Sequence, residues 1–122
     1  MSEKYLLDLL QDIWEEDGMF NYLKVNYVKH SKKSLSYIQN IIIIGLKYGV
    51  FEMYKCTSKN KLLKIEDFKK IHTDKALEIV KNQEAWEQDE IIYEVIFVDK
   101  DKWFNDLFNV KVIPKIFVNG ID

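Results

Sequence analysis

Few residues in this chain are of the types that carry out nucleophilic or metal chemistry. The sequence has one cysteine, Cys56, and two histidines, His30 and His72. A cysteine nucleophile needs a base within hydrogen-bond reach, and zinc ligands commonly come in closely spaced pairs of cysteine and histidine. The three residues are far apart in sequence, so we expect neither a thiol active site nor a metal or cofactor site. Cys56 is more typical of a small apolar residue at a strand end.

Carboxylates in close pairs are the other candidates for catalysis. Asp8 lies four residues before Asp12, and Glu87 is followed by Asp89 and Glu90. General acid and base roles require burial or a neighbour that sets two carboxyl pKa values apart, whereas dense charge runs usually form a solvated face. The four glycines lack the spacing of a phosphate-binding loop and are typical of helix ends and a turn. We therefore expect a protein that is not an enzyme.

The N-terminal carboxylates are expected on one face of a helix over residues 3–16. Apolar residues recur there at helical spacing, Ser2 is a candidate N-cap, and Gly18 stands beyond the C-terminal end. The opposite face carries a stripe of acids, Asp8, Asp12, Glu15 and Glu16. Three of them lie in the last turns, where the helix dipole disfavours negative charge. We infer that a group outside the helix offsets this cost.

Other helices are expected where apolar residues follow the same period. One is predicted over residues 20–29, although Leu23, Val25 and Tyr27 also alternate as in a strand. Another is predicted over 35–48, capped by Ser34 and ended by Gly49. Thr73 is expected to cap a helix over 74–86, and Asp99 an aromatic-rich helix after it. A short helix over 66–71 is also expected.

Strands are predicted where apolar and β-branched residues alternate or run together. The expected strands cover residues 50–56, 62–65, 91–98 and 110–118. The apolar run 91–98 suits a central strand, and Pro114 places the last strand at a sheet edge or beside a bulge. The chain has 122 residues, 48% of them apolar, enough to bury one core. We expect an α+β fold with four to five helices packed on a small, mainly antiparallel sheet, as a single globular domain over residues 1–122.

Charge is distributed unevenly along the chain. The formal net charge is −2, but residues 1–18 carry −5, residues 19–77 carry +8 and residues 78–106 carry −6. All the basic residues are lysine, so the chain lacks the planar fork that arginine uses for guanine readout and phosphate clamping. The longest uncharged run, residues 34–46, is well short of the ~20 apolar residues that span a bilayer. The N-terminus lacks the order of a signal peptide, so we expect a cytoplasmic protein without a membrane span.

The basic block offers one alternative function. A helix over 34–48 followed by a hairpin over 50–65 resembles the helix-and-wing order of a winged-helix nucleic-acid-binding or regulatory domain, with Lys59, Lys61 and Lys64 in the wing. The helix has no charge over residues 35–46 and is more typical of core than of a groove reader. Nucleic acid is therefore not the partner that we expect first.

Acidic segments beside tryptophans favour a protein-binding function. Trp14 lies in the stretch LLQDIWEED (9–17), Trp86 opens WEQDEII (86–92), and Trp103 follows. Aromatic anchors beside a charged rim are typical of electrostatically steered interfaces. In size and character the chain resembles the small bacterial immunity proteins of contact-dependent growth inhibition systems. The resemblance implies a cytoplasmic toxin inhibitor that covers the active site or substrate surface of a cognate toxin, commonly a nuclease. The expected contact residues are Asp8, Asp12, Glu15, Glu16, Glu87, Asp89 and Glu90.

Overall fold

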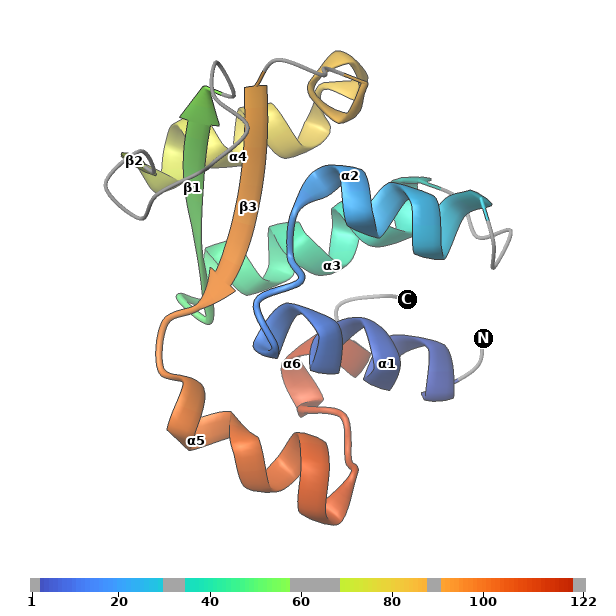
Figure 1. The fold of residues 1–122 in the computed structure, drawn as a ribbon. Helices are drawn as coiled ribbons and strands as arrows, with labels where there is room; N and C mark the ends of the chain where they lie inside the picture. The colour runs from blue at the N-terminus through green and yellow to red at the C-terminus, as the bar shows by residue number, and fades with distance from the viewer. Residues whose placement is uncertain (1–2, 30–34, 58–68, 88–90, 120–122) are drawn as a thin grey trace.

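A computed structural model describes residues 3–29, 35–57, 69–87 and 91–119 of the chain (Figure 1). These residues form helices packed against an antiparallel sheet, which confirms the predicted α+β class. In chain order the elements are α1 (Glu3–Trp14), α2 (Phe20–Leu23) continued by the π-helical η1 (Lys24–Lys29), α3 (Leu35–Lys47), β1 (Phe51–Thr57), β2 (Lys69–Ile71), α4 (Thr73–Lys81), the 3₁₀ turn η3 (Gln83–Trp86), β3 (Ile91–Phe97), α5 (Lys100–Phe104) continued by the π-helical η4 (Asn105–Val110), and α6 (Lys115–Asn119). No helix among these ranges is both long and apolar enough to cross a bilayer.

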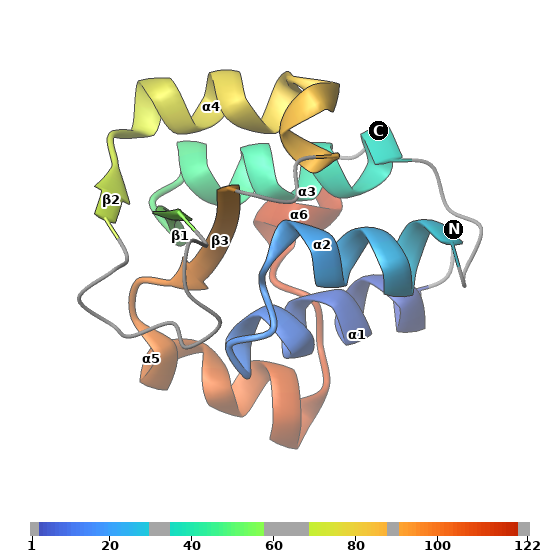
Figure 2. The same ribbon diagram turned by 45° about the horizontal axis from the view of Figure 1, so that its top comes forward.

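Helix α3 is the central element of the core. It lies between α4 on one side and α1 and α2 on the other (Figure 2). Seven of its residues are buried, including Ile38, Ile41 and Ile42. The helix ends as the sequence predicted: Gly49 has a φ of 72°, and the Val50 N–H donates to the Gly45 carbonyl at 2.8 Å.

The sheet has the strand order β2-β1-β3, with both pairs antiparallel. The strand predicted to be central, β3, therefore lies beside β1 and not between two strands of the described sheet. Register places Met53 of β1 opposite Ile71 of β2 and Val95 of β3. These residues share the face that packs on α3 and α4, and Tyr54 and Glu94 lie on the other face.

Two sequence predictions around the sheet are affected by the observed pairing. The strand that pairs with β1 is β2 at Lys69–Ile71, so the helix predicted over 66–71 is wrong for its described part. The strand predicted over 62–65 lies outside the described residues. Helix α4 ends at Lys81, short of the predicted 86, and its N-cap is His72, whose Nδ1 accepts from the Asp74 N–H at 3.3 Å.

The strand predicted over 110–118 is wrong. This segment continues η4 to Val110, turns through Lys111 at a φ of 60°, and then forms α6. The Phe117 N–H donates to the Pro114 carbonyl at 3.0 Å, and the Phe117 ring is fully buried 5.7 Å from that of Phe51. The alternation places Val110, Val112 and Val118 on one side of the predicted strand, and all three are exposed.

Candidate functional site

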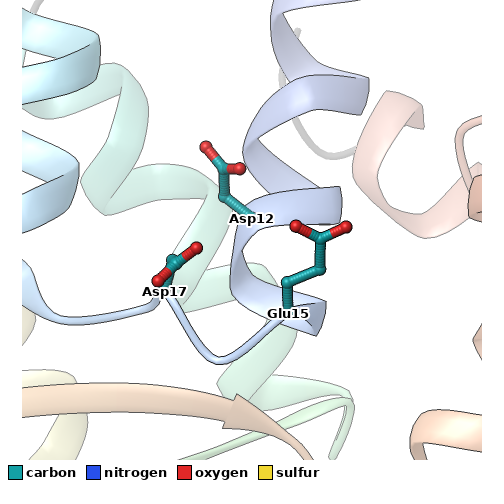
Figure 3. A group of neighbouring side chains, drawn as sticks. All are labelled: Asp12, Glu15 and Asp17. Carbon is teal, nitrogen blue, oxygen red and sulfur yellow. The ribbon is translucent and has the colours of Figure 1, made fainter.

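The acidic residues of α1 gather where the helix ends. Asp12 lies on the last turn of α1, which ends at Trp14, so Glu15 and Glu16 lie in the turn after the helix and not on its face as predicted. Asp17 follows them, and the nearest carboxylate oxygens of Asp12, Glu15 and Asp17 are within 4.8 Å of one another (Figure 3). Asp8 lies one turn before Asp12, close enough for its charge to raise the Asp12 pKa. Like charges at this spacing repel one another, so the cluster is held together by the fold around it.

The chain reverses after α1 through an unusual residue. Glu16 has a φ of 70°, in the left-handed region, while its N–H donates to the Ile13 carbonyl at 3.1 Å. The next N–H, that of Asp17, donates to the Asp12 carbonyl at 2.9 Å. These two bonds close a Schellman motif in which Glu16 takes the place usually held by glycine. Gly18, predicted to follow the end of this helix, is not the left-handed residue of the motif. Its backbone packs against β3 instead.

Asp12 is a partly buried carboxylate of α1. Burial raises its pKa, and the neighbouring acids Asp17, Glu15 and Asp8 add to that effect. The hydroxyl of Tyr27 on η1 donates to Asp12 Oδ2, which lowers the Asp12 pKa in part. Burial together with this hydrogen bond raises the pKa of Tyr27 itself. Tyr27 is thus one group outside α1 that offsets the unfavourable position of the acidic stripe, as the sequence led us to expect.

Glu16 contacts a lysine of α5, whereas Asp12 contacts Tyr27. Its Oε1 lies 3.4 Å from Nζ of Lys100, at the start of α5. The same ammonium stands 4.3 Å from the centroid of the Trp14 ring, whose Nε1 donates to the Lys100 carbonyl at 2.8 Å. Trp14 also contacts Phe104 and Phe108, with ring centroids 5.2 and 5.1 Å away. Acids and half-exposed aromatic rings therefore share the end of α1.

A further acid that sequence reasoning did not select joins this group. Glu94 lies in the middle of β3, where Met19 forms an isolated bridge with it. Burial raises its pKa to about 7, and the charges of Glu16 and Asp17 contribute. Glu94 is the one charged residue in the apolar strand 91–97, and that isolation was the available signal. We define the acidic surface as Asp8, Asp12, Glu15, Glu16, Asp17 and Glu94.

The second set of predicted contact residues is not part of the acidic surface. Glu87 is exposed after η3, which lies at the end of α4 and away from α1 in both ribbon views (Figures 1 and 2). Asp89 and Glu90 lie outside the described residues. Trp86, expected beside them as an interface anchor, is a core residue: it is 1% exposed, stacks on Phe20 with centroids 3.9 Å apart, and donates from Nε1 to the Val80 carbonyl.

The histidines and the cysteine considered as nucleophiles or metal ligands are located as follows. His72 is exposed and caps α4, Cys56 lies near the end of β1, and His30 lies outside the described residues. Carboxylate oxygens suit hard cations such as Ca²⁺ or Mg²⁺, and Asp12, Glu15 and Asp17 are the described residues that could supply them. Tyr27 already occupies one of the Asp12 oxygens, and carboxylate spacing alone does not assign a metal.

The winged-helix interpretation depends on the helix and the hairpin of the basic block. Its helix, α3, contributes seven buried residues to the core, and its wing lysines 59, 61 and 64 lie outside the described residues. In comparison with known proteins, no family model fits the chain, and no curated protein or solved structure is similar to it.

Proposed function

We propose that the protein is an immunity-type inhibitor that binds a basic surface of a cognate toxin through the acidic surface. The observation that carries the proposal is the convergence of six carboxylates from α1, the loop after it and β3. Among the described residues, Lys100 is the one ammonium that pairs with them, through Glu16 at 3.4 Å. A carboxylate surface with so little internal neutralisation attracts a positively charged partner and speeds the encounter.

The aromatic side chains beside the acids supply the second element of such an interface. Phe104 is 41% exposed and stacks on Phe108 with centroids 5.2 Å apart, and both rings contact Trp14. Aromatic anchors commonly carry much of the binding energy in protein interfaces. The cation of Lys100 over Trp14 is the kind of contact that a partner lysine or arginine would make here.

Neutralisation on this proposal is occlusion and involves no chemical step. The carboxylates take the positions of nucleic-acid phosphates on a basic toxin surface, so that substrate and inhibitor compete for the same cations. The inhibitor acts in the cytoplasm, where a nuclease toxin would find its substrate.

The first experiment is a search of the neighbouring genes for a large secreted protein with a toxin-like C-terminal domain, followed by co-expression of that domain with the chain. The expected result is rescue of growth and purification of the two chains as a complex. Growth arrest despite equal expression of the soluble inhibitor would contradict the proposal.

Variants of the acidic surface then test where the toxin binds. Asp8→Asn with Glu15→Gln removes two charges, and we expect association to slow by about tenfold at low salt. Glu78→Gln with Glu84→Gln, two exposed acids of α4 and η3, is the matched control for the same change in net charge. Equal effects of the two pairs on the association rate would exclude the acidic surface as the contact site.

A further inference from the structure

Two lysines lie directly opposite each other in the sheet, away from the acidic surface. Register pairs Lys55 of β1 with Lys69 of β2, on the face of the sheet that α4 covers. Like charges at directly opposed positions destabilise an antiparallel pair. No carboxylate of the described residues lies within 4.0 Å of either ammonium. Among the described residues, these two cations at one end of the sheet are therefore not neutralised.

Lys55 also lines a pocket of about 250 Å³ between the sheet and α4. The other lining residues are Ile71, Lys75, Ile79, Asn82, Ala85 and Tyr93. Lys75 pairs with Glu78 at 3.4 Å, with both side chains largely exposed, so the pair is weak. Hydrogen-bond donors and an apolar wall thus share one concave site.

The polar groups of the pocket favour an anion. Lysine ammonium groups are donors only. The side-chain oxygen of Asn82, Oδ1, accepts from the Glu84 N–H at 3.0 Å. The NH₂ group of the same side chain is left to donate. The described residues that line the pocket include no carboxylate. Compact, strongly hydrated ammonium groups are common ligands of phosphate.

The acidic surface does not oppose an anion here, because it lies across the sheet. Glu94 is on the opposite face of the sheet from Lys55. Burial raises the Glu94 pKa to about 7, and the charges of Glu16 and Asp17 add to this effect, so these acids lie near Glu94. In both ribbon views β2 and α4 lie apart from α1 (Figures 1 and 2). The positive and negative sites are thus separated by the fold.

We propose that the pocket between the sheet and α4 binds the phosphate group of a small molecule, free phosphate or a nucleotide, through Lys55 and Lys75, with Lys69 beside them. Ile71, Ile79 and Ala85 contact the remainder of a nucleotide. Binding neutralises the opposed lysines and stabilises the fold by mass action. This site is independent of toxin binding, which uses other residues.

Titration of the full chain with three probes tests the proposal. Inorganic phosphate, adenosine monophosphate and a short single-stranded DNA are each added, with binding followed by calorimetry and by the thermal midpoint. We expect phosphate and the nucleotide to raise the midpoint. If adenosine monophosphate binds more tightly than inorganic phosphate, the apolar side chains of the pocket contact its nucleoside. If the two bind equally, the site recognises the phosphate group alone. Binding of the DNA without binding of phosphate or the nucleotide would overturn the proposal and indicate a site for the nucleic-acid backbone.

Variants locate the site. Lys55→Gln and Lys75→Gln are each expected to weaken phosphate binding by about tenfold, because each removes a charge-assisted hydrogen bond. Lys70→Gln is the control, since Lys70 neighbours Lys69 but lies on the other face, paired with Glu52 at 3.0 Å. Absence of binding by the unmodified chain, or an equal loss in Lys70→Gln, would overturn the proposal. In the absence of phosphate, Lys55→Gln is expected to retain or increase the thermal midpoint, so loss of binding is distinguished from unfolding.

Discussion

The Val95 N–H donates to the Gly18 carbonyl at 3.0 Å, and a Cβ at Gly18 would stand 2.1 Å from the Val95 carbonyl oxygen. The loop after α1 is therefore in backbone contact with β3. This contact brings Glu16 and Asp17 to Glu94, and so assembles the acidic surface from two segments far apart in sequence.

Gly18→Ala is expected to destabilise the protein by about 3 kcal/mol or more, because backbone must move to admit the methyl group. Gly49→Ala is the comparison: its φ of 72° is unfavourable for alanine, but no atom lies within 4 Å of the added carbon, so the cost is about 1 kcal/mol. Urea unfolding measures both. Equal costs would show that the loop yields easily at β3.

Glu16→Gly is expected to stabilise the protein by about 0.5–1 kcal/mol. Glycine adopts the left-handed conformation of this position without strain, and the exposed pair with Lys100 contributes little. Glu16→Gln is the matched control, since it removes the charge but keeps the strained backbone. If it stabilises the fold as much as glycine does in urea unfolding, charge repulsion and not backbone strain explains the gain.

Tyr27→Phe is expected to cost about 1–2 kcal/mol at pH 7. It removes the hydroxyl that donates to Asp12 and leaves a half-buried carboxylate without this donor. The pKa of Asp12 should rise further, because the hydrogen bond from Tyr27 lowers it. The cost should therefore be smaller at pH 3, where Asp12 is protonated in both states.

Unfolding of the Tyr27→Phe variant at the two pH values measures this difference. Tyr22→Phe is the control, because Tyr22 is a half-buried tyrosine of α2. The same cost at both pH values would mean that the Tyr27 hydroxyl does not act through the Asp12 charge.

Glu94 is expected to make stability depend on pH in the neutral range. Its pKa is about 7 in the folded protein, against 4.5 as the ordinary value. Below pH 4.5 the carboxyl is protonated in both states. As pH rises from 4.5 through 7, the unfolded chain ionises first, and stability is lost. The loss is on the order of 1–2 kcal/mol, since solvent screens a half-buried group.

Glu94→Gln should remove this loss, so that the stability difference between variant and parent grows from pH 4.5 to 7 and is constant above it. Urea unfolding across that range measures the difference, and NMR titration of the side chain gives the pKa directly. Glu16→Gln should lower the Glu94 pKa, because the Glu16 charge raises it. A Glu94 pKa near 4.5 would contradict the burial of this carboxyl.

The sequence predicted elements whose signals are local. Helix α3 was placed from its apolar run and its terminal glycine, α1 from its period, β1 from its alternating apolar residues, and β3 from its β-branched residues. It also placed Asp8 and Asp12 on α1. These predictions succeeded because capping, helical period and strand propensity act between residues a few positions apart.

The strand predicted over residues 110–118 was wrong because long-range packing, and not local pattern, decides the structure of this segment. Its valines alternate as in a strand, but burial of Phe117 beside Phe51 fixes α6 as a helix against the core. Alternation over a few residues does not specify which side will find a partner. The same limit made Trp86 look like an interface anchor when it packs on Phe20.

The sequence by itself thus determined the helix-rich α+β class, the part of the acidic stripe that Asp8 and Asp12 form on α1, and the segregation of charge along the chain. Only the tertiary structure decided that Glu94 joins that stripe, that Glu87 does not, and that Lys55 faces Lys69 across a strand pair. Side-chain period is set by each residue's neighbours in sequence, whereas the meeting of charges depends on which segments pack together. Gly18 approaches Val95 closely, and β1 pairs with β2. Both contacts join segments that are apart in sequence, so the local sequence pattern does not predict them.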